Sequence, residues 1–150
     1  MPPVDHLPMS FVPAAPAIRT IAPLRVAEVM SWGLVSCPAE ASLETVAALM
    51  SAERVHCVVV LSGAEAGARW GVVSDVDLVA AASVRSLAEQ RADGTAMRPA
   101  VTIAPSESLD VAARLMTTTG VSHLVVVDPA ERRPVGVLST LDVAGALSAR

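Results

Sequence analysis

Serine and aspartate recur three residues apart in two matching stretches, "GVVSDVDLV" and "GVLSTLDVA". The first stretch holds Ser74 and Asp77, and the second holds Ser139 and Asp142. In each, an apolar β-branched segment runs into the serine, which predicts a strand that turns directly into a helix. A helix N-terminus offers unpaired N–H groups and a partial positive charge, so a phosphate can bind there. The aspartate, one turn further on, can accept hydrogen bonds from both hydroxyls of a ribose.

The same spacing also has a purely structural explanation. Ser-x-x-Asp at a helix start is close to a capping box, with the serine at the N-cap and the acid at N3. Capping alone would account for both pairs, and the residues by themselves leave the two explanations open.

Composition limits what the chain can do. Of its 150 residues, 53% are hydrophobic and 17% are charged, so most of the chain must be core. No apolar run approaches the roughly 18 residues that cross a bilayer, and the start of the chain lacks the pattern of a secretory signal. The net charge is −4 and no lysine-rich stretch occurs, which argues against nucleic acid as the main partner. We expect a cytoplasmic protein with no membrane partner.

The two cysteines, Cys37 and Cys57, do not resemble a disulfide framework and favour a reducing environment. His56 and Cys57 are adjacent in a strand pattern and point to opposite faces, so they cannot converge on one metal ion. We find no nucleophile with its base, no metal cluster and no phosphate-binding loop of catalytic type. We therefore expect neither a metal site nor an enzyme.

The second half of the chain repeats the first, which indicates duplicated supersecondary units that share a core. Each half reads as strand, helix, strand, strand, helix. The first helix of each half has apolar residues on one face: Leu43, Val46, Ala47 and Met50, or Leu109, Ala112, Ala113 and Met116. Ser42 and Ser108 precede these helices, where an N-cap belongs.

Residues 1–25 contain six of the eleven prolines, so we expect an arm that is neither helix nor central strand.

This duplicated β-α-β-β-α unit resembles the CBS domain, which occurs in tandem as a Bateman pair. The resemblance rests on "SCPAEASLETVAALM", "MRPAVTIAPSESLDVAARLM", "GVSHLVVVD" and the two glycine–serine–aspartate turns, and covers about residues 26–147. It implies an α/β (α+β) fold in which repeats 26–88 and 89–150 pack as a pseudo-two-fold pair after the arm at 1–25. It also implies a stand-alone regulatory module, not an enzyme, that requires no cofactor and forms homodimers.

The resemblance further implies that an adenosine-containing ligand binds between the repeats: AMP, ADP, ATP or S-adenosylmethionine. Ligand binding would regulate a partner protein that the sequence does not identify. The alternative is a ligand-free CBS-fold module for dimerisation or protein interaction.

By analogy with the family, each cleft combines the first strand of one repeat with the Ser-Asp turn of the other. Apolar walls for the adenine would come from Leu34, Val55, Val101 and Val121. Members that bind ligands often carry a basic residue just before the second strand. At those places this chain has His56 and Cys57 in one repeat, and Ser122 and His123 in the other. The phosphate would therefore depend on His56, His123 and the helix ends.

Two expectations separate the clefts and describe the dimer. Ser74 is followed by Asp75, whose charge would oppose a phosphate, whereas Ser139 is followed by Thr140, which adds a hydroxyl. The cleft of Ser139, Thr140 and Asp142, with Leu34, Val55 and His56 opposite, should therefore bind more tightly.

The first helices carry further apolar residues, Ala48, Leu49 and Leu115, which predicts that a dimer buries them.

Overall fold

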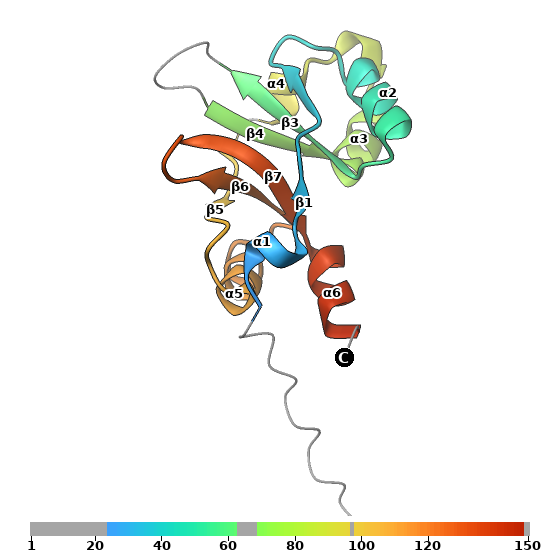
Figure 1. The fold of residues 1–150 in the computed structure, drawn as a ribbon. Coiled ribbons are helices and arrows are strands. Elements are labelled where there is room, and N and C mark those ends of the chain that lie inside the picture. Colours follow the sequence, from blue (N-terminus) through green and yellow to red (C-terminus); the bar gives the residue numbers. More distant parts are fainter. Residues whose placement is uncertain (1–23, 63–68, 97, 149–150) are drawn as a thin grey trace, which may run out of the picture.

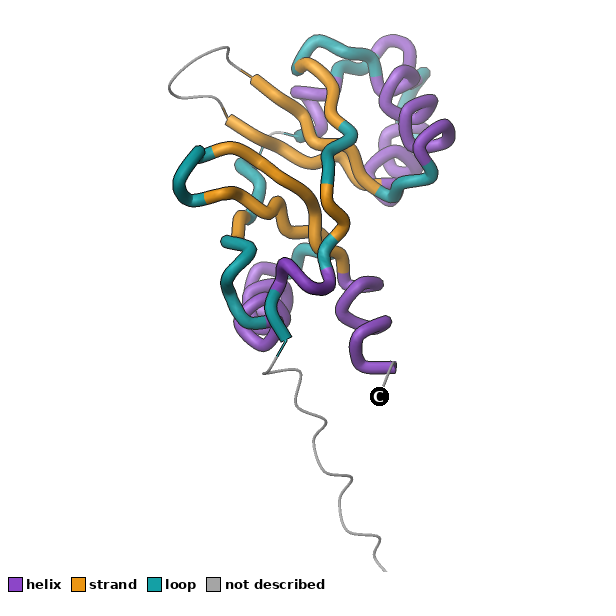
Figure 2. Tube along the Cα trace, in the orientation of Figure 1, coloured by secondary structure: helices purple, strands orange, loops and turns teal. Residues whose placement is uncertain are grey.

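The computed structural model describes residues 24–62, 69–96 and 98–148. The arm predicted over residues 1–25 lies outside this part, apart from Leu24 and Arg25. The described residues form two lobes, each a small sheet with helices on its outer side, and the two sheets lie next to each other in the middle (Figures 1 and 2). The predicted α/β class, with the same order of elements in both halves, is confirmed.

Lobe 1 has a three-stranded sheet in the order β2-β3-β4, with β2 parallel and β4 antiparallel to β3. Its elements are β2 (Ser36–Pro38), α2 (Leu43–Glu53), β3 (Cys57–Ser62), β4 (Arg69–Ser74), α3 (Asp75–Ala82), the 3₁₀ helix η1 (Leu87–Glu89) and α4 (Ala92–Thr95).

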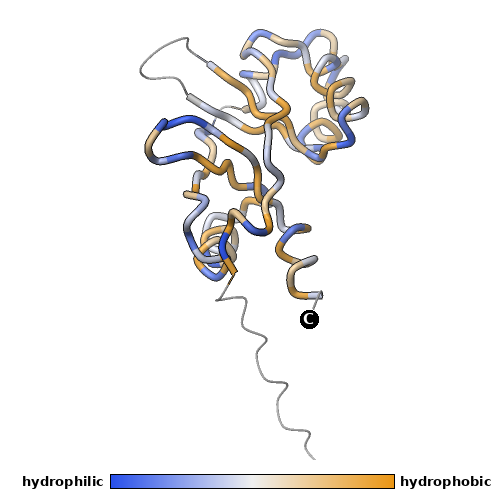
Figure 3. Tube along the Cα trace, in the orientation of Figure 1, coloured by the Kyte–Doolittle hydropathy of each residue, from blue (hydrophilic) through white to orange (hydrophobic). Residues whose placement is uncertain are grey.

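Lobe 2 has a four-stranded sheet in the order β1-β7-β6-β5, in which only β5 and β6 are parallel. Its elements are α1 (Val26–Val29), β1 (Ser31–Trp32), β5 (Thr102–Ile103), α5 (Leu109–Thr119), β6 (His123–Asp128), β7 (Arg133–Ser139) and α6 (Thr140–Ser148). The strands are mostly hydrophobic and the turn between β6 and β7 is hydrophilic (Figure 3).

The first helix of each repeat forms as the sequence predicts. Ser42 accepts a hydrogen bond from the Thr45 N–H at 3.1 Å, and Ser108 accepts one from the Val111 N–H at 3.2 Å. Of the predicted apolar faces, the alanines Ala47 and Ala113 are half-buried and the remaining residues are buried. Both helices end in the left-handed conformation, at Arg54 in α2 and at Gly120 in α5.

The lobes exchange the segments that lead into each repeat. Residues 24–33 belong to the first repeat in sequence but pack on lobe 2, where Val26 is fully buried. Likewise α4 begins the second repeat but packs on lobe 1, where Ala92 is fully buried. Each lobe therefore combines parts of both repeats.

Matching backbone hydrogen bonds hold both exchanged segments. The Leu109 N–H donates to the Leu24 carbonyl at 2.8 Å, and the Leu43 N–H donates to the Gln90 carbonyl at 2.8 Å. Near the ends of the same segments, Gly33 donates to Val135 at 2.9 Å and Ala100 donates to Trp70 at 2.7 Å. The two halves are thus related by pseudo-two-fold symmetry at the level of individual bonds.

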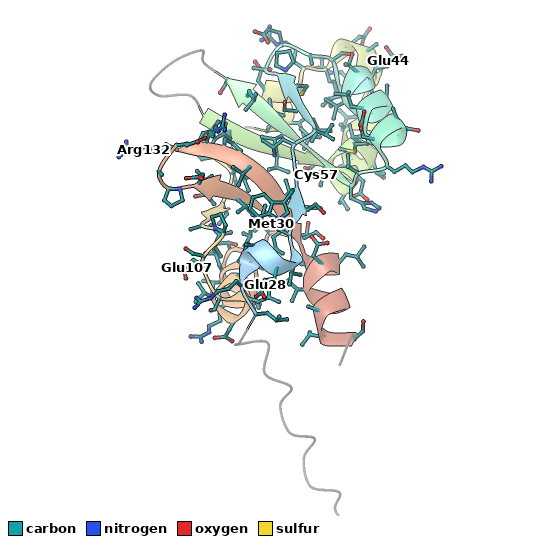
Figure 4. The ribbon with its side chains drawn as sticks, in the orientation of Figure 1. Glu28, Met30, Glu44, Cys57, Glu107 and Arg132 are labelled. Atoms are coloured by element: carbon teal, nitrogen blue, oxygen red, sulfur yellow. The ribbon has the colours of Figure 1, made fainter. Side chains whose placement is uncertain are left out.

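The repeated glycines of the two motifs lie under these exchanged segments. A Cβ at Gly136 would lie 2.2 Å from the Ser31 carbonyl oxygen and 2.3 Å from the Met30 Cε. A Cβ at Gly71 would lie 2.7 Å from the Ala96 Cβ. Figure 4 shows Met30 lying on the sheet of lobe 2. Glycine is needed at both places because another backbone approaches the strand closely.

No helix in the described ranges combines the length and the apolar character needed to cross a membrane.

Candidate ligand-binding clefts

Both Ser-Asp pairs form complete capping boxes. The Ser74 N–H donates to Asp77 Oδ2 at 2.8 Å, and the Asp77 N–H donates back to Ser74 Oγ at 3.3 Å. The distances for Ser139 and Asp142 are 2.8 Å and 3.1 Å. The structural explanation of the motif therefore holds, and it occupies one carboxylate oxygen of each aspartate. Within the described ranges, Oδ1 of Asp77 and of Asp142 accepts no hydrogen bond from the protein.

One cleft, the Ser74 cleft, lies between the helix start of α3 in lobe 1 and the strand ends of lobe 2. Its volume is about 480 Å³, within the range of small-molecule sites. It is lined by Val72, Ser74, Asp77, Thr95, Ala96, Arg98, Pro99, Ala100, Val101, Gly120, Val121, Ser122 and His123.

The second cleft, the Ser139 cleft, is the pseudo-two-fold counterpart, between the start of α6 and the strand ends of lobe 1. Its volume is about 390 Å³. It is lined by Ser31, Trp32, Gly33, Leu34, Val35, Glu53, Arg54, Val55, His56, Cys57, His123, Val137, Ser139, Leu141 and Asp142.

These two cavities bring together almost all of the residues that the sequence singled out. Ser74, Asp77, Val101, Val121, Ser122 and His123 line the first, and Leu34, Val55, His56, Ser139 and Asp142 line the second. Thr140 is the exception. It lies by a separate shallow depression beside Met116 and Gly120, and its N–H donates to the Ser122 carbonyl at 2.9 Å. The expectation that its hydroxyl serves the Ser139 cleft is not supported.

A comparison against protein families agrees with this duplicated architecture. The model of the CBS domain matches the chain twice, over residues 26–84 and 94–149. The chain belongs to the CBS domain family. No curated protein matches it at a significant level.

Solved structures of CBS proteins share the fold. A CBS domain protein of Pyrobaculum aerophilum in complex with AMP is 28% identical with a TM-score of 0.72, covering 84% of this chain and 97% of that one. The CBS domain pair of protein MJ0100 with 5′-methylthioadenosine and S-adenosyl-L-methionine is 18% identical with a TM-score of 0.71, covering 84% and 97%.

A hexameric CBS-CP12 protein from bloom-forming cyanobacteria is 21% identical with a TM-score of 0.74. The match covers 81% of this chain and 69% of that one, and 66% of the chain in a second structure of that protein. The CBS pair here therefore spans about two thirds of the length of those chains.

Asp75 does not line the Ser74 cleft of this CBS pair. Its Oδ2 lies 3.1 Å from His56 Nδ1, and its Oδ1 accepts a hydrogen bond from the Val76 N–H at 2.8 Å. The hydrogen bond with His56 is the main reason why the pKa of Asp75 lies below its usual value. The Asp75 carboxylate is directed at His56 and not into the Ser74 cleft, and the expectation that its charge weakens that cleft stays a prediction.

His123 lines both clefts and so forms part of the wall between them. Its Nδ1 lies 3.0 Å from Ser122 Oγ. Burial lowers the pKa of His123, and the nearby carboxylates of Asp75, Asp142 and Asp77 oppose that shift. The imidazole is thus held toward its neutral form, which makes it a hydrogen-bonding group and a weak anchor for phosphate.

Cys57 occupies the position in β3 that His123 occupies in β6, since they pair with Ser74 and Ser139 respectively. Figure 4 shows it near the border between the sheets. Cys57 and Cys37 are both free and buried. Burial, followed by the charges of Asp75 and Asp142, raises the pKa of Cys57 to about 11. The thiol is therefore a packing group, because the reactive thiolate is scarce at neutral pH.

Sequence reasoning missed three side chains that face the clefts. Arg98 lines the Ser74 cleft, and Arg54 and Trp32 line the Ser139 cleft. Arg98 and Trp32 lie on the exchanged segments, and local patterns cannot show which lobe such segments cover. Arg54 could have been noticed, because it occupies the helix-ending position that Gly120 occupies in the second repeat.

Proposed function

We propose that this CBS pair is a regulatory module that binds an adenosine-containing nucleotide between its repeats and passes the signal to a partner protein. The observation that carries this proposal is the makeup of the clefts. Each combines a Ser-x-x-Asp helix start from one lobe with strand ends from the other. A ligand there touches both lobes, so its binding free energy depends on how they lie relative to each other.

The Ser139 cleft has groups for each part of a nucleotide. Leu34, Val55 and Val137 offer apolar surface for adenine. Asp142 Oδ1 remains free to accept hydrogen bonds from ribose hydroxyls, while Oδ2 caps the helix. The N-terminus of α6 and the Ser139 hydroxyl favour a phosphate. AMP in the Pyrobaculum aerophilum protein supports this choice of ligand.

A thermal shift screen tests the proposal. AMP, ADP, ATP, NAD and S-adenosylmethionine are added separately at millimolar concentration to the full chain. We expect at least one to raise the melting temperature, because a ligand that binds only the native state stabilises it. A lack of any shift would contradict nucleotide binding and favour the ligand-free interaction module.

Matched serine variants locate the site. Ser139→Ala and Ser108→Ala each remove one N-cap hydroxyl, which costs about 1 kcal/mol. Only Ser139 lines a cleft. Ser74→Ala and Ser42→Ala form the same kind of pair for the Ser74 cleft. We expect a cleft serine to weaken the ligand-induced shift and its control to lower only the melting temperature without ligand.

We also propose a homodimer, through a surface other than the one first expected. Leu49 and Leu115 pack against their own lobes, so the first helices need no partner to bury them. The second helices carry strongly exposed apolar residues: Val76 and Val79 on α3 are both 73% exposed, and Leu141 on α6 is 68% exposed. Because α3 and α6 are pseudo-two-fold counterparts, their faces suit a self-complementary contact with a second copy.

Light scattering tests the homodimer. We expect a mass of two chains at micromolar concentration, and a shift toward one chain in Val79→Asp. Val111→Asp is the control, because Val111 is exposed on α5 and lines a depression with residues of β5 and β6. A parent chain that is monomeric throughout would contradict the homodimer.

A further inference from the structure

The internal repeat shows where the two clefts differ. At the end of the first helix, Arg54 lines the Ser139 cleft and its counterpart Gly120 lines the Ser74 cleft. Gly33 and Ala100 make matching backbone hydrogen bonds. The residue before Gly33 is Trp32, which lines the Ser139 cleft, and the residue before Ala100 is Pro99, which lines the Ser74 cleft. Both differences add a large side chain, one cationic and one aromatic, to the same cleft.

Arg54 holds a backbone conformation that suits glycine. Its φ of 53° and ψ of 47° are left-handed, and the chain uses glycine at the equivalent position in α5. In the described part of the chain, the Arg54 guanidinium makes no hydrogen bond or ion pair. The folded structure therefore gives no internal reason for arginine here, and a strained residue with an unused side chain in a cleft points to a ligand.

Trp32 is a large aromatic residue held at the cleft while still exposed. Trp32 is 62% exposed, yet its indole N–H donates to the Ala27 carbonyl at 3.1 Å. That hydrogen bond restrains the ring. Exposed and restrained, the ring can provide a stacking surface whose ordering costs little when a planar ligand binds.

Building on the function proposed above, we propose that the Ser139 cleft is the one that reads both parts of a nucleotide. The planar base lies against the indole of Trp32, and the phosphate meets the guanidinium of Arg54. Trp32 belongs to lobe 2 and Arg54 to lobe 1, so the ligand bridges the lobes through two chemically different contacts.

The Ser74 cleft has a cation but not this pairing. Arg98 lines it, but Pro99 stands where the other cleft has Trp32. The second tryptophan, Trp70, lines a smaller neighbouring pocket with Arg98 and Asp93, not the cleft itself. We therefore expect the Ser74 cleft to contribute little to recognition of an aromatic base.

The experiment compares adenosine with AMP by calorimetric titration, because the two differ only by the phosphate. In Arg54→Gly we expect AMP to bind about tenfold more weakly and adenosine to bind as in the parent. In Trp32→Leu we expect both to weaken by about tenfold. Arg132→Gly is the matched control, because Arg132 has a left-handed φ of 52° like Arg54 but lines neither cleft, and it should change neither ligand. Arg98→Ser, which installs the residue type found at Ser31, compares the other cleft and should weaken AMP less than Arg54→Gly does.

Fluorescence and stability complete the test. In a Trp70→Phe background Trp32 is the only tryptophan, and we expect AMP to change its emission. Without ligand, Arg54→Gly should melt no lower than the parent, so that its weaker AMP binding cannot be ascribed to unfolding.

The outcomes separate this proposal from the function on which it rests. If AMP raises the melting temperature but leaves Trp32 emission unchanged, or if Arg98→Ser and not Arg54→Gly weakens AMP, this proposal is overturned and nucleotide binding stands. If the parent binds no nucleotide, the proposed function fails and this inference falls with it.

Discussion

Lobe 1 and lobe 2 share their backbone framework and differ in the side chains at their clefts. The hydrogen bond from Leu43 to Gln90 is repeated by the bond from Leu109 to Leu24, with the same length of 2.8 Å. At the clefts, by contrast, equivalent positions carry different residues. Arg54 in the first repeat corresponds to Gly120 in the second, and Cys57 corresponds to His123. The framework depends on backbone contacts and small residues, which tolerate little change. The side chains that differ between the clefts make none of these matching backbone bonds, so the two lobes can perform different tasks on one fold.

The largest effects should come from the glycines under the exchanged segments. We expect Gly136→Ala to lower the free energy of unfolding by about 3 kcal/mol, because the new Cβ would meet a backbone oxygen that cannot move without displacing β1. Gly71→Ala should cost less, since its closest contacts, the Cβ and the carbonyl oxygen of Ala96 at 2.7 Å and 2.8 Å, are longer than those at Gly136. Urea unfolding measures both.

Gly145→Ala is the control for these glycines. Gly145 lies within α6 with no atom near its prospective Cβ, so alanine should be neutral or stabilising there. A Gly136→Ala chain as stable as the parent would show that the exchanged segment is loosely held.

The exchanged segment of lobe 2 also contributes to its core. We expect Val26→Ala to cost about 2 kcal/mol, because Val26 is fully buried and loses two methyl groups. The counterpart in lobe 1 is already alanine, at Ala92, so the two lobes differ in how much apolar volume the segments supply. Val84→Ala, at an exposed position, should change the urea midpoint little. Equal effects of both substitutions would contradict the exchange.

The helix-ending residues give a smaller and opposite pair of effects. Gly120→Ala should lower the free energy of unfolding by about 1 kcal/mol, because alanine is strained at a φ of 73°. Arg54→Gly should raise it by a smaller amount, since the strain is relieved but the unfolded chain gains freedom. Thermal melts of both variants measure the signs. If Arg54→Gly is clearly destabilising, Arg54 supports the fold and is not reserved for a ligand.

The smallest effect should be a dependence on pH that comes from His123 in lobe 2 and is not shared by its counterpart in lobe 1, Cys57. Burial lowers the pKa of His123 in the folded chain. As the pH falls below about 6.5, the His123 imidazole is therefore protonated in the unfolded chain before it is protonated in the folded chain. Stability from His123 is therefore present at neutral pH and is lost as the pH falls toward the lowered value. We expect His123→Gln to lose less stability than the parent between pH 7 and pH 5. Cys57, the counterpart, does not titrate in that window because its pKa is raised to about 11. An equal loss in both chains would contradict this assignment.

The sequence predicts what depends on local pattern. The apolar stripe from Leu43 to Met50 and the serine at position 42 fix α2 because helix periodicity and capping act over a few residues. The clefts followed from the family resemblance together with the two Ser-Asp turns. Most of the residues expected there line them.

What escaped prediction depends on three-dimensional placement. Asp75 was expected beside a phosphate, but its side chain is directed toward His56 from the preceding loop. Thr140 was assigned to the cleft of its neighbour Ser139, although successive residues at a helix start point in different directions. The exchange of segments involves residues far apart in sequence, and no periodicity in residues 24–33 reveals which lobe they cover.

That exchange changes how the chain is divided in space. Lobe 1 is one continuous stretch, from the β2 region to the Ala100 hydrogen bond with Trp70. Lobe 2 is discontinuous, because its core needs Val26 and Met30 as well as residues that come after Ala100. In topological terms lobe 1 is an insertion within lobe 2. During synthesis lobe 1 can close as soon as α4 has emerged, whereas residues 24–33 must wait for β7. To close, lobe 2 must bring together two segments that the whole of lobe 1 separates in sequence. We expect this closure to be the slow step of folding.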